Sequence, residues 1–434
     1  MIAKLKKHLL LLFIISSSSI ISQSFEFDSN IYSPESQGLS SKRIDKLNSS
    51  MRDYVDNGKI SCVQTAIMRN GKIVHFNSYG YSNLKTKELI NEKSIFRIYS
   101  MTKPIVSIAL MMLYEEGKFL LDDPVEKYIP EFKNMKYYDG ENIVKSNSKI
   151  KIIDLLRHTS GIGYGWGYDK VDYLYKDNVS PYQQFKNINS SKELVERISS
   201  IPLYFEPGKY WKYGLSTNVC GYLVELISNE SLDVFLKKRL FKPLGMNDTY
   251  FNLPKNKLNR LIKNYTSDSG GKLVELDDYL TTRHEKNLNW FDGGGGLVST
   301  SMDYLRFCQM LLNMGKLENT RILSPKTFEF IVSNHTIGIE PFKPIIVGIG
   351  GGSRSYLPDN GAAFGLGFSI TENVAKSMIL GSKGTYGWSG AAGTYFRIDP
   401  KENLIYLLMI QQQPHSYIKI RDYFQKLVYQ SIID

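Results

Sequence analysis

The chain has 434 residues, of which 42% are hydrophobic and 22% are charged, as is typical of a globular protein with a large core. Its net charge of +11 is spread along the chain without a block of like charges, so we expect a basic surface and no nucleic-acid binding. Cys62, Cys220 and Cys308 are too few and too scattered for a disulfide scaffold. We expect buried free thiols, with one disulfide as the alternative.

The first residues have the order of a secretory leader. Three lysines precede an apolar run over residues 9–15, and a serine-rich stretch continues to about residue 24. The apolar run is too short to span a bilayer stably. We therefore predict a signal peptide over residues 1–24 and a secreted or periplasmic protein, which would contact a membrane only if the leader stayed uncleaved.

Hydrophobic periodicity predicts an amphipathic helix over residues 40–55. Strands follow over 62–68 and 72–79, because Asn70-Gly71 between them is a strong hairpin signal. An apolar helix then begins near Ser100 and ends at Gly117. Residues 133–148 are polar and predict a surface loop, whereas further helices are expected over 152–157, 192–199, 219–227 and 232–240.

Strand patterns return near the end of the chain. A helix over 302–314 and a Gly/Pro-rich loop over 338–365 precede expected strands at 367–370, 378–380, 393–398 and 404–411, and a final helix at 417–428. This order predicts an α+β fold, a mainly antiparallel β-sheet flanked by helices with a mainly helical insertion. We expect a single domain over 25–434, with a sheet subdomain at about 25–119 and 291–434 and a helical subdomain at about 120–290.

Four consecutive glycines, Gly293 to Gly296, invite comparison with a nucleotide-binding loop. No strand precedes them, and Val298 stands where a third spaced glycine would be needed. A tight turn where backbones pack closely is the better interpretation.

Ser100 and Lys103 form the chemically informative pair. They lie one turn apart at the start of the apolar helix, so their side chains share a face. A serine hydroxyl becomes a good nucleophile when a neighbouring base removes its proton. Free N–H groups at the helix start would favour an oxyanion beside Ser100. A four-residue pattern is also common by chance, so other segments have to support it.

Further segments in the same order resemble motifs of the serine β-lactamase and penicillin-binding-protein superfamily. The resemblance covers residues 31 to 413 and is closest to class C β-lactamase-like esterases. The segments that carry it are Ser100-Met101-Thr102-Lys103, Leu155 to Gly161, Tyr213 to Asn218, Gly293 to Thr300 and Gly387 to Thr394. It implies a β-lactamase/transpeptidase-like fold.

The resemblance also implies the catalytic roles. Ser100 would be the acylated nucleophile, with Lys103 and Tyr213 as its partners; which of these two is the base stays open. The backbone N–H groups of Ser100 and Ala391 would form the oxyanion hole. His158 lies in a segment that we expect to be architectural.

Two departures from the β-lactamase pattern concern the substrate. Leu215 stands where an asparagine is usual, and Trp388 replaces a lysine that helps to bind a carboxylate. We therefore expect esterase-type hydrolysis of a small neutral acyl substrate. The substrate-binding residues would be Trp388, Ser389, Gly390, Leu215 and Trp166.

Several alternatives stay open. The same site could serve a β-lactamase, a D-aminopeptidase or amide hydrolase, or a catalytically silent penicillin-binding-like sensor. An α/β-hydrolase would instead use Ser389, Asp399 and His415, although its strand–helix alternation is missing from the first half of the chain. We expect no cofactor and no metal, since the histidines lack metal-ligand spacing, and we expect a monomer.

Overall fold

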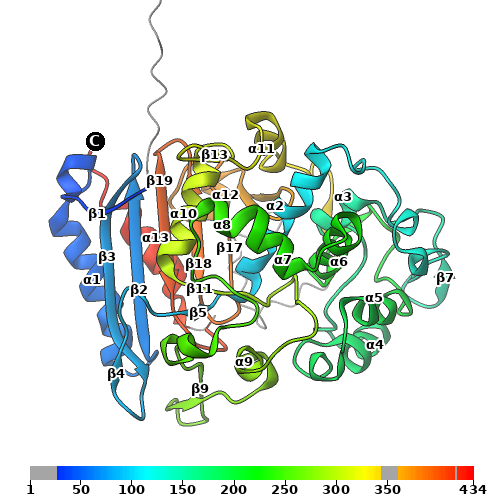
Figure 1. The fold of residues 1–434 in the computed structure, drawn as a ribbon, viewed down its shortest axis with the longest axis horizontal. Helices are drawn as coiled ribbons and strands as arrows, with labels where there is room; N and C mark the ends of the chain where they lie inside the picture. The colour runs from blue at the N-terminus through cyan, green and yellow to red at the C-terminus, as the bar shows by residue number, and fades with distance from the viewer. Residues whose placement is uncertain (1–26, 344–359, 416–417) are drawn as a thin grey trace, which may run out of the picture.

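The computed structural model describes residues 27–343, 360–415 and 418–434, so the predicted leader lies outside the described residues. A nine-stranded sheet runs through this part of the chain (Figure 1). Its strands, in spatial order, are β1 (Asp28–Ile31), β3 (Lys72–Asn83), β2 (Cys62–Arg69), β19 (Leu404–Met409), β18 (Tyr395–Asp399), β17 (Tyr386–Ser389), β16 (Ser369–Thr371) and β15 (Ala362–Phe364), with β4 (Glu88–Leu89) beside β3.

The two ends of the chain build this sheet together. The β2–β3 hairpin turns at Asn70 and Gly71, whose φ values of 53° and 75° suit these two residue types. β2 then pairs antiparallel with β19, with Arg69 opposite Leu404. β1 runs parallel to β3, whereas the other pairs in the sheet are antiparallel.

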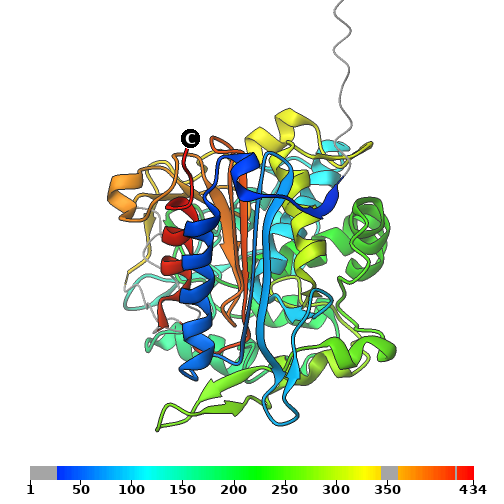
Figure 2. The same ribbon diagram turned by 90° about the vertical axis from the view of Figure 1, so that its left-hand side faces the viewer.

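Helices cover both faces of the sheet. α1 (Ser41–Asp56) and α13 (Ile420–Tyr429) lie side by side on one face (Figure 2). α10 (Ser301–Leu312) packs against β18 and β19 on the other face, where α2 (Thr102–Glu115) also lies. Residues 102–113 of α2 are all buried, because the helix is enclosed between the sheet and further helices.

The remaining helices are mostly beyond α2 (Figure 1). α6 (Ser216–Ser228) packs directly on α2 and is itself contacted by α3 (Ile152–Leu156), α5 (Ser191–Ser199) and α7 (Leu232–Leu236). The other helices are α4 (Lys170–Val179), α8 (Lys242–Leu244), α9 (Tyr279–Thr282), α11 (Pro325–Ile331) and α12 (Val374–Ser377). In the described part of the chain, every helix is too short or too polar to cross a membrane.

Short strands form two-stranded pairs outside the main sheet. They are β5 (Phe96–Arg97) with β11 (Val298–Ser299), β6 (Lys136–Tyr138) with β7 (Ile143–Lys145), β8 (Tyr210–Trp211) with β14 (Glu340–Pro341), β9 (Tyr265–Ser267) with β10 (Leu273–Glu275), and β12 (Lys316–Leu317) with β13 (Thr320–Arg321).

The α+β fold is confirmed, and three local expectations were wrong at least in part. The loop expected over 338–365 contains β14 and β15, and its residues 344–359 lie outside the described residues. Residues 133–148 contain the β6–β7 hairpin, and their many polar residues reflect its exposure. Residues 378–380 are not a strand, because α12 precedes them and Met378 adopts a φ of 57°. All three cysteines are buried free thiols. The subdomain boundaries and the monomeric state stay predictions.

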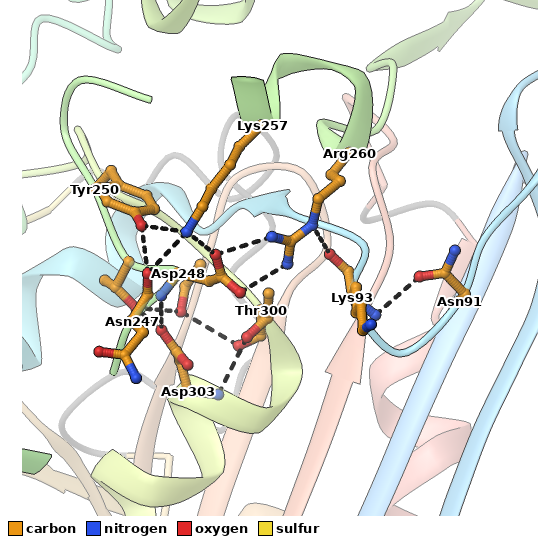
Figure 3. A network of polar contacts seen from close by, with 11 residues as sticks. Asn91, Lys93, Asn247, Asp248, Tyr250, Lys257, Arg260, Thr300 and Asp303 are labelled. Atoms are coloured by element: carbon orange, nitrogen blue, oxygen red, sulfur yellow. Dashed lines mark hydrogen bonds and ion pairs between the residues drawn. The ribbon is translucent and has the colours of Figure 1, made fainter. Parts of the chain in front are cut away.

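A polar network ties the start of α10 to the segment that follows α8 (Figure 3). Asp303 Oδ2 accepts hydrogen bonds from the Asp248 backbone N–H at 2.7 Å and from the Thr249 hydroxyl at 2.8 Å. The Asp248 carboxylate is in turn paired with Arg260 and Lys257. Burial raises the pKa of Asp303 to about 6, because the charged carboxylate is poorly solvated there.

The raised pKa of Asp303 predicts that ionising this carboxyl lowers the free energy of unfolding, and that an asparagine in its place would avoid this loss. Asp303 has an ordinary value of 3.8, so the native state holds a proton that the unfolded state loses, and stability falls as pH rises from about 4 to 6. Above pH 6 the penalty approaches about 3 kcal/mol. Asp303→Asn keeps an oxygen for both hydrogen bonds, so its stability relative to wild type should rise between pH 4 and pH 7.5 in urea unfolding.

The exposed carboxylate of Asp45 on α1 offers the matched control. Asp45→Asn should show no such rise. A difference between Asp303→Asn and wild type that stays constant with pH would contradict the assignment.

Candidate active site

Ser100 lies in the short 3₁₀ turn Tyr99–Met101 that leads into α2. Tyr99 has a φ of 43°, which is strained for a residue with a side chain, and Asn264 Nδ2 donates to its hydroxyl at 3.0 Å. The Met101 carbonyl accepts from the Tyr304 hydroxyl at 2.9 Å. The turn is thus held on both sides of Ser100, which remains partly exposed.

Lys103 is the centre of the site, although only 1% of it is exposed. Its Nζ lies 3.3 Å from Ser100 Oγ, 2.8 Å from the Tyr164 hydroxyl and 2.6 Å from the Gly294 carbonyl oxygen. Three acceptors match the three protons of an ammonium group. A buried cation is tolerated where its donors are satisfied in this way.

Tyr213 follows β8 and lies beside the same lysine. Lys103 Nζ is 4.8 Å from the centre of the Tyr213 ring, and Trp388 Nε1 donates to the Tyr213 hydroxyl at 3.3 Å. Tyr213 and Ser100 are both partly exposed. They lie more than a hundred residues apart in the chain, and each contacts Lys103. The three residues expected to be catalytic are therefore connected through Lys103.

Aromatic rings make up most of the surroundings of Tyr213. The distances from the centre of the Tyr213 ring to the centres of the neighbouring rings are 4.9 Å for His158, 5.3 Å for Trp388, 5.5 Å for Tyr164, 6.1 Å for Trp166 and 6.4 Å for Trp211. Trp166 stacks on Tyr164 at 4.4 Å with an angle of 10° between the rings. These contacts place Trp166 and Trp388 beside Tyr213, and their binding of a substrate stays a prediction.

His158 is buried beside the cation. Burial, and the positive charge of Lys103, lower the pKa of His158 well below its ordinary value, so the ring stays neutral. Its edge packs on Tyr213, Trp211 and Phe364, and within the described residues neither ring nitrogen has a hydrogen-bond partner. These contacts agree with the architectural role expected for it.

The end of β17 approaches Ser100 from the sheet. A Cβ on Gly390 would lie 2.4 Å from the Ile98 carbonyl oxygen, so only glycine lets the two backbones come this close. The turn over residues 390–394 is held by Arg421 of α13, which donates to the carbonyl groups of Gly390, Gly393 and Thr394. The partly exposed Ala391 follows Gly390 directly, at the position proposed for an oxyanion donor.

Leu215, Gly390 and Ser389 were also predicted to bind substrate. Leu215 is fully buried in the hydrophobic core, so we expect no direct contact with a substrate, and this revises the prediction. Gly390 acts through its backbone, as described above. Ser389 at the end of β17 is partly exposed and stays a candidate.

The alternative set of Ser389, Asp399 and His415 does not form a triad. Ser389 pairs with Tyr395 at one end of β18, and Asp399 lies at the other end of that strand. Four residues of strand separate these ends by about 13 Å. Asp399 instead accepts a hydrogen bond from the Tyr429 hydroxyl at 2.6 Å.

Sequence reasoning missed two partners of Lys103, Tyr164 and Gly294. Tyr164 was visible only as part of an aromatic, glycine-rich loop, and Gly294 contributes its carbonyl group, which no side-chain motif reveals. Burial raises the pKa of Tyr164 well above its ordinary value, with further contributions from Tyr213 and Asp292. Tyr164 thus stays a neutral phenol that can accept from the lysine.

A mixed α/β structure with a central sheet and a serine–lysine pair at the start of a buried helix is the architecture of β-lactamase-type serine hydrolases. The chain belongs to the family described as Beta-lactamase, which matches residues 47–430.

Relatives extend the comparison. Protein Rv1367c of Mycobacterium tuberculosis is 30% identical over 380 residues, which cover 86% of this chain and 90% of the relative. A Salmonella agona protein provisionally named as a D-alanyl-D-alanine carboxypeptidase is 27% identical over 418 residues, covering 88% and 86%. The solved structure of EstCE1, a hydrolase with promiscuous acyltransferase activity, is similar with a TM-score of 0.77 and 22% identity, covering 89% and 98%. The similarity to EstCE1 shows the fold alone.

Tyr164→Phe tests the second phenol. The change keeps the ring stacked on Trp166 but removes one acceptor of a buried cation. A hydrogen bond to a charged group contributes about 1.5–3 kcal/mol, so kcat/KM for p-nitrophenyl butyrate should fall about 10- to 100-fold.

Tyr386→Phe is the matched control, because the Tyr386 hydroxyl is buried and has no partner among the described residues. It should stay within about twofold of wild type. Equal activity of both variants would exclude a role for the Tyr164 hydroxyl.

Proposed function

We propose that this protein is a carboxylesterase-type serine hydrolase that acts on neutral acyl substrates through an acyl-enzyme on Ser100. The observation that carries the proposal is the contact of Lys103 Nζ with Ser100 Oγ, the Tyr164 hydroxyl and the Gly294 carbonyl. It supports a charged lysine that organises the site, with Tyr213 as the base.

In the first step, Ser100 Oγ attacks the substrate carbonyl carbon and its proton passes to Tyr213. Tyr213 would accept this proton as a phenolate, and the Lys103 ammonium group beside its ring would stabilise the negative charge. The N–H groups of Ser100 and Ala391 would stabilise the tetrahedral oxyanion. When the intermediate collapses, Tyr213 returns the proton to the leaving group.

In the second step, water attacks the acyl-enzyme. Tyr213 takes a proton from the water, and Ser100 Oγ leaves with that proton as the free acid is released. Trp388 Nε1, which donates to the Tyr213 hydroxyl, would help to hold the phenol in place through both steps.

The aromatic surroundings support a neutral substrate. Trp388 and Trp166 present apolar faces beside Tyr213, and the one cation in contact with Ser100 within the described residues, Lys103, is buried and fully hydrogen-bonded. Lys103 is therefore not available to pair with a substrate carboxylate. The name of EstCE1 as a hydrolase agrees with this proposal.

Peptide hydrolysis is the second candidate, because the Salmonella agona relative is provisionally named as a D-alanyl-D-alanine carboxypeptidase. β-Lactam hydrolysis and a silent sensor use the same acylated serine and differ in the substrate or in the fate of the acyl group.

Covalent labelling identifies the nucleophile. A fluorophosphonate probe should add one adduct to Ser100 in intact-protein and peptide mass spectra, because it reacts with an activated serine. Ser100→Ala should abolish the adduct, whereas Ser389→Ala, which changes another partly exposed serine near the site, should keep it. An adduct that survives Ser100→Ala would overturn the proposal.

A substrate panel separates the activities. kcat/KM for p-nitrophenyl butyrate should exceed that for nitrocefin and for a D-alanyl-D-alanine peptide by at least about 10-fold, which corresponds to about 1.4 kcal/mol of transition-state stabilisation. Faster turnover of the peptide would favour a carboxypeptidase. Labelling of Ser100 without turnover of any substrate would favour a sensor.

A further inference from the structure

Behind Lys103 lies a buried carboxylate that takes no part in the steps above. Asp292 precedes the glycine turn and is 7% exposed. Its Oδ1 accepts from the Gly294 N–H at 2.9 Å and from Asn218 Nδ2 at 2.7 Å. Its Oδ2 accepts from Arg283 Nη1 at 2.8 Å.

The backbone of Asp292 constrains the same turn. Its carbonyl oxygen accepts from the N–H groups of Gly295 at 3.2 Å and Gly296 at 2.8 Å. The Gly294–Gly295 peptide is planar, so holding the Gly295 N–H toward the Asp292 backbone carbonyl directs the Gly294 carbonyl the opposite way, toward Lys103 Nζ at 2.6 Å. The Asp292 carboxylate holds the preceding Gly293–Gly294 peptide through the Gly294 N–H, so Gly294 is fixed on both sides. Arg283 also donates to the next carbonyl, that of Gly295, at 2.7 Å.

The turn has little freedom to rearrange. A Cβ on Gly294 would lie 2.3 Å from Asn218 Oδ1, and one on Gly293 would lie 3.3 Å from the Cα of Gly221 on α6. Since α6 packs on α2, the turn is clamped between the helix that carries Lys103 and its neighbour.

We propose that Asp292 is a positioning residue for catalysis. Its carboxylate, held by Asn218 and Arg283, binds the Gly294 N–H and so keeps Gly294 in the conformation in which its carbonyl aims the Lys103 ammonium group at Ser100. The inference rests on the proposed function. Asp292 does not touch the substrate, and it acts through a single backbone carbonyl. A buried carboxylate paired with arginine could also serve stability alone, and the experiment has to separate these roles.

The rate and the extent of labelling by a fluorophosphonate probe make this separation. The extent reports the fraction of folded, competent sites, whereas the rate constant reports how well each site activates Ser100. Asp292→Ala should reach a final extent close to that of its folded fraction, with a rate constant at least about 30-fold lower, as expected when a hydrogen bond that orients a charged group is lost.

Asp292→Asn is the conservative variant and keeps an oxygen for Gly294 and Asn218, so its rate constant should lie between those of Asp292→Ala and wild type. Asp303→Ala is the matched control: it removes a buried carboxylate that also accepts from a backbone N–H and a hydroxyl, and its rate constant should stay within about twofold. If Asp292→Ala does not fold, Asn218→Ala, which leaves the ion pair intact, should still slow labelling about 3- to 10-fold.

A second measurement does not depend on activity. Hydrogen exchange of the peptide spanning residues 292–297 should accelerate in Asp292→Ala and not in Asp303→Ala, because the Gly294 N–H loses its acceptor. Unchanged exchange, or a labelling rate constant equal to that of wild type, would overturn the role of Asp292. Absence of labelling in wild type would instead overturn the proposed function, and the exchange result would stand by itself.

Discussion

The structure depends on a charged amine that is kept out of water. A buried ammonium group is costly unless its protons are accepted. One acceptor of Lys103 is local, Ser100 one turn away, and the other two come from distant parts of the chain: Tyr164 from the aromatic loop and Gly294 from the glycine turn. Bringing these three together fixes where the helical region sits against the start of α2. The requirement to satisfy the Lys103 ammonium group therefore also fixes the surroundings of Ser100.

The sheet provides the other side of the site. β17 ends beside Ile98 because Gly390 allows a close approach of backbones, and Arg421 of α13 holds the turn that follows. Since β2 pairs with β19, the N-terminal hairpin and the C-terminal strands form one rigid layer behind this turn. An oxyanion donor at Ala391 would thus be as fixed as the sheet itself, which is the arrangement that preorganised electrostatic stabilisation requires.

Proteins of this fold are named for different activities, so the fold does not define the substrate. The side chains around Tyr213 are the feature of this chain that bears on it. Rings surround the phenol here, and the indole of Trp388 donates to its hydroxyl. These apolar faces are the basis on which we propose a neutral substrate. The family membership defines the reaction class, whereas these side chains are the basis for the proposed choice among esters, peptides and β-lactams.

Local sequence was sufficient where the deciding interactions are local. Asn70-Gly71 determined the first hairpin, apolar spacing determined α1 and α2, and the spacing of Ser100 and Lys103 placed both on one helical turn. Local sequence failed where its signals are weak. Polar residues concealed the β6–β7 hairpin, and the left-handed backbone conformation of Met378 prevents the strand expected over 378–380. The resemblance to a family, and not any spacing, singled out Tyr213 among the tyrosines.

Only the tertiary structure decided which groups surround the lysine. Tyr164 resembled any aromatic residue in a flexible loop, Asp292 any acidic residue before a turn, and Gly294 contributes a carbonyl group that every residue possesses. They come together with Lys103 through packing between segments that are at least about sixty residues apart in the chain. The sequence by itself determined that Ser100 and Lys103 are neighbours, because both lie on one helical turn. The remaining contacts depend on long-range burial, which local patterns do not encode.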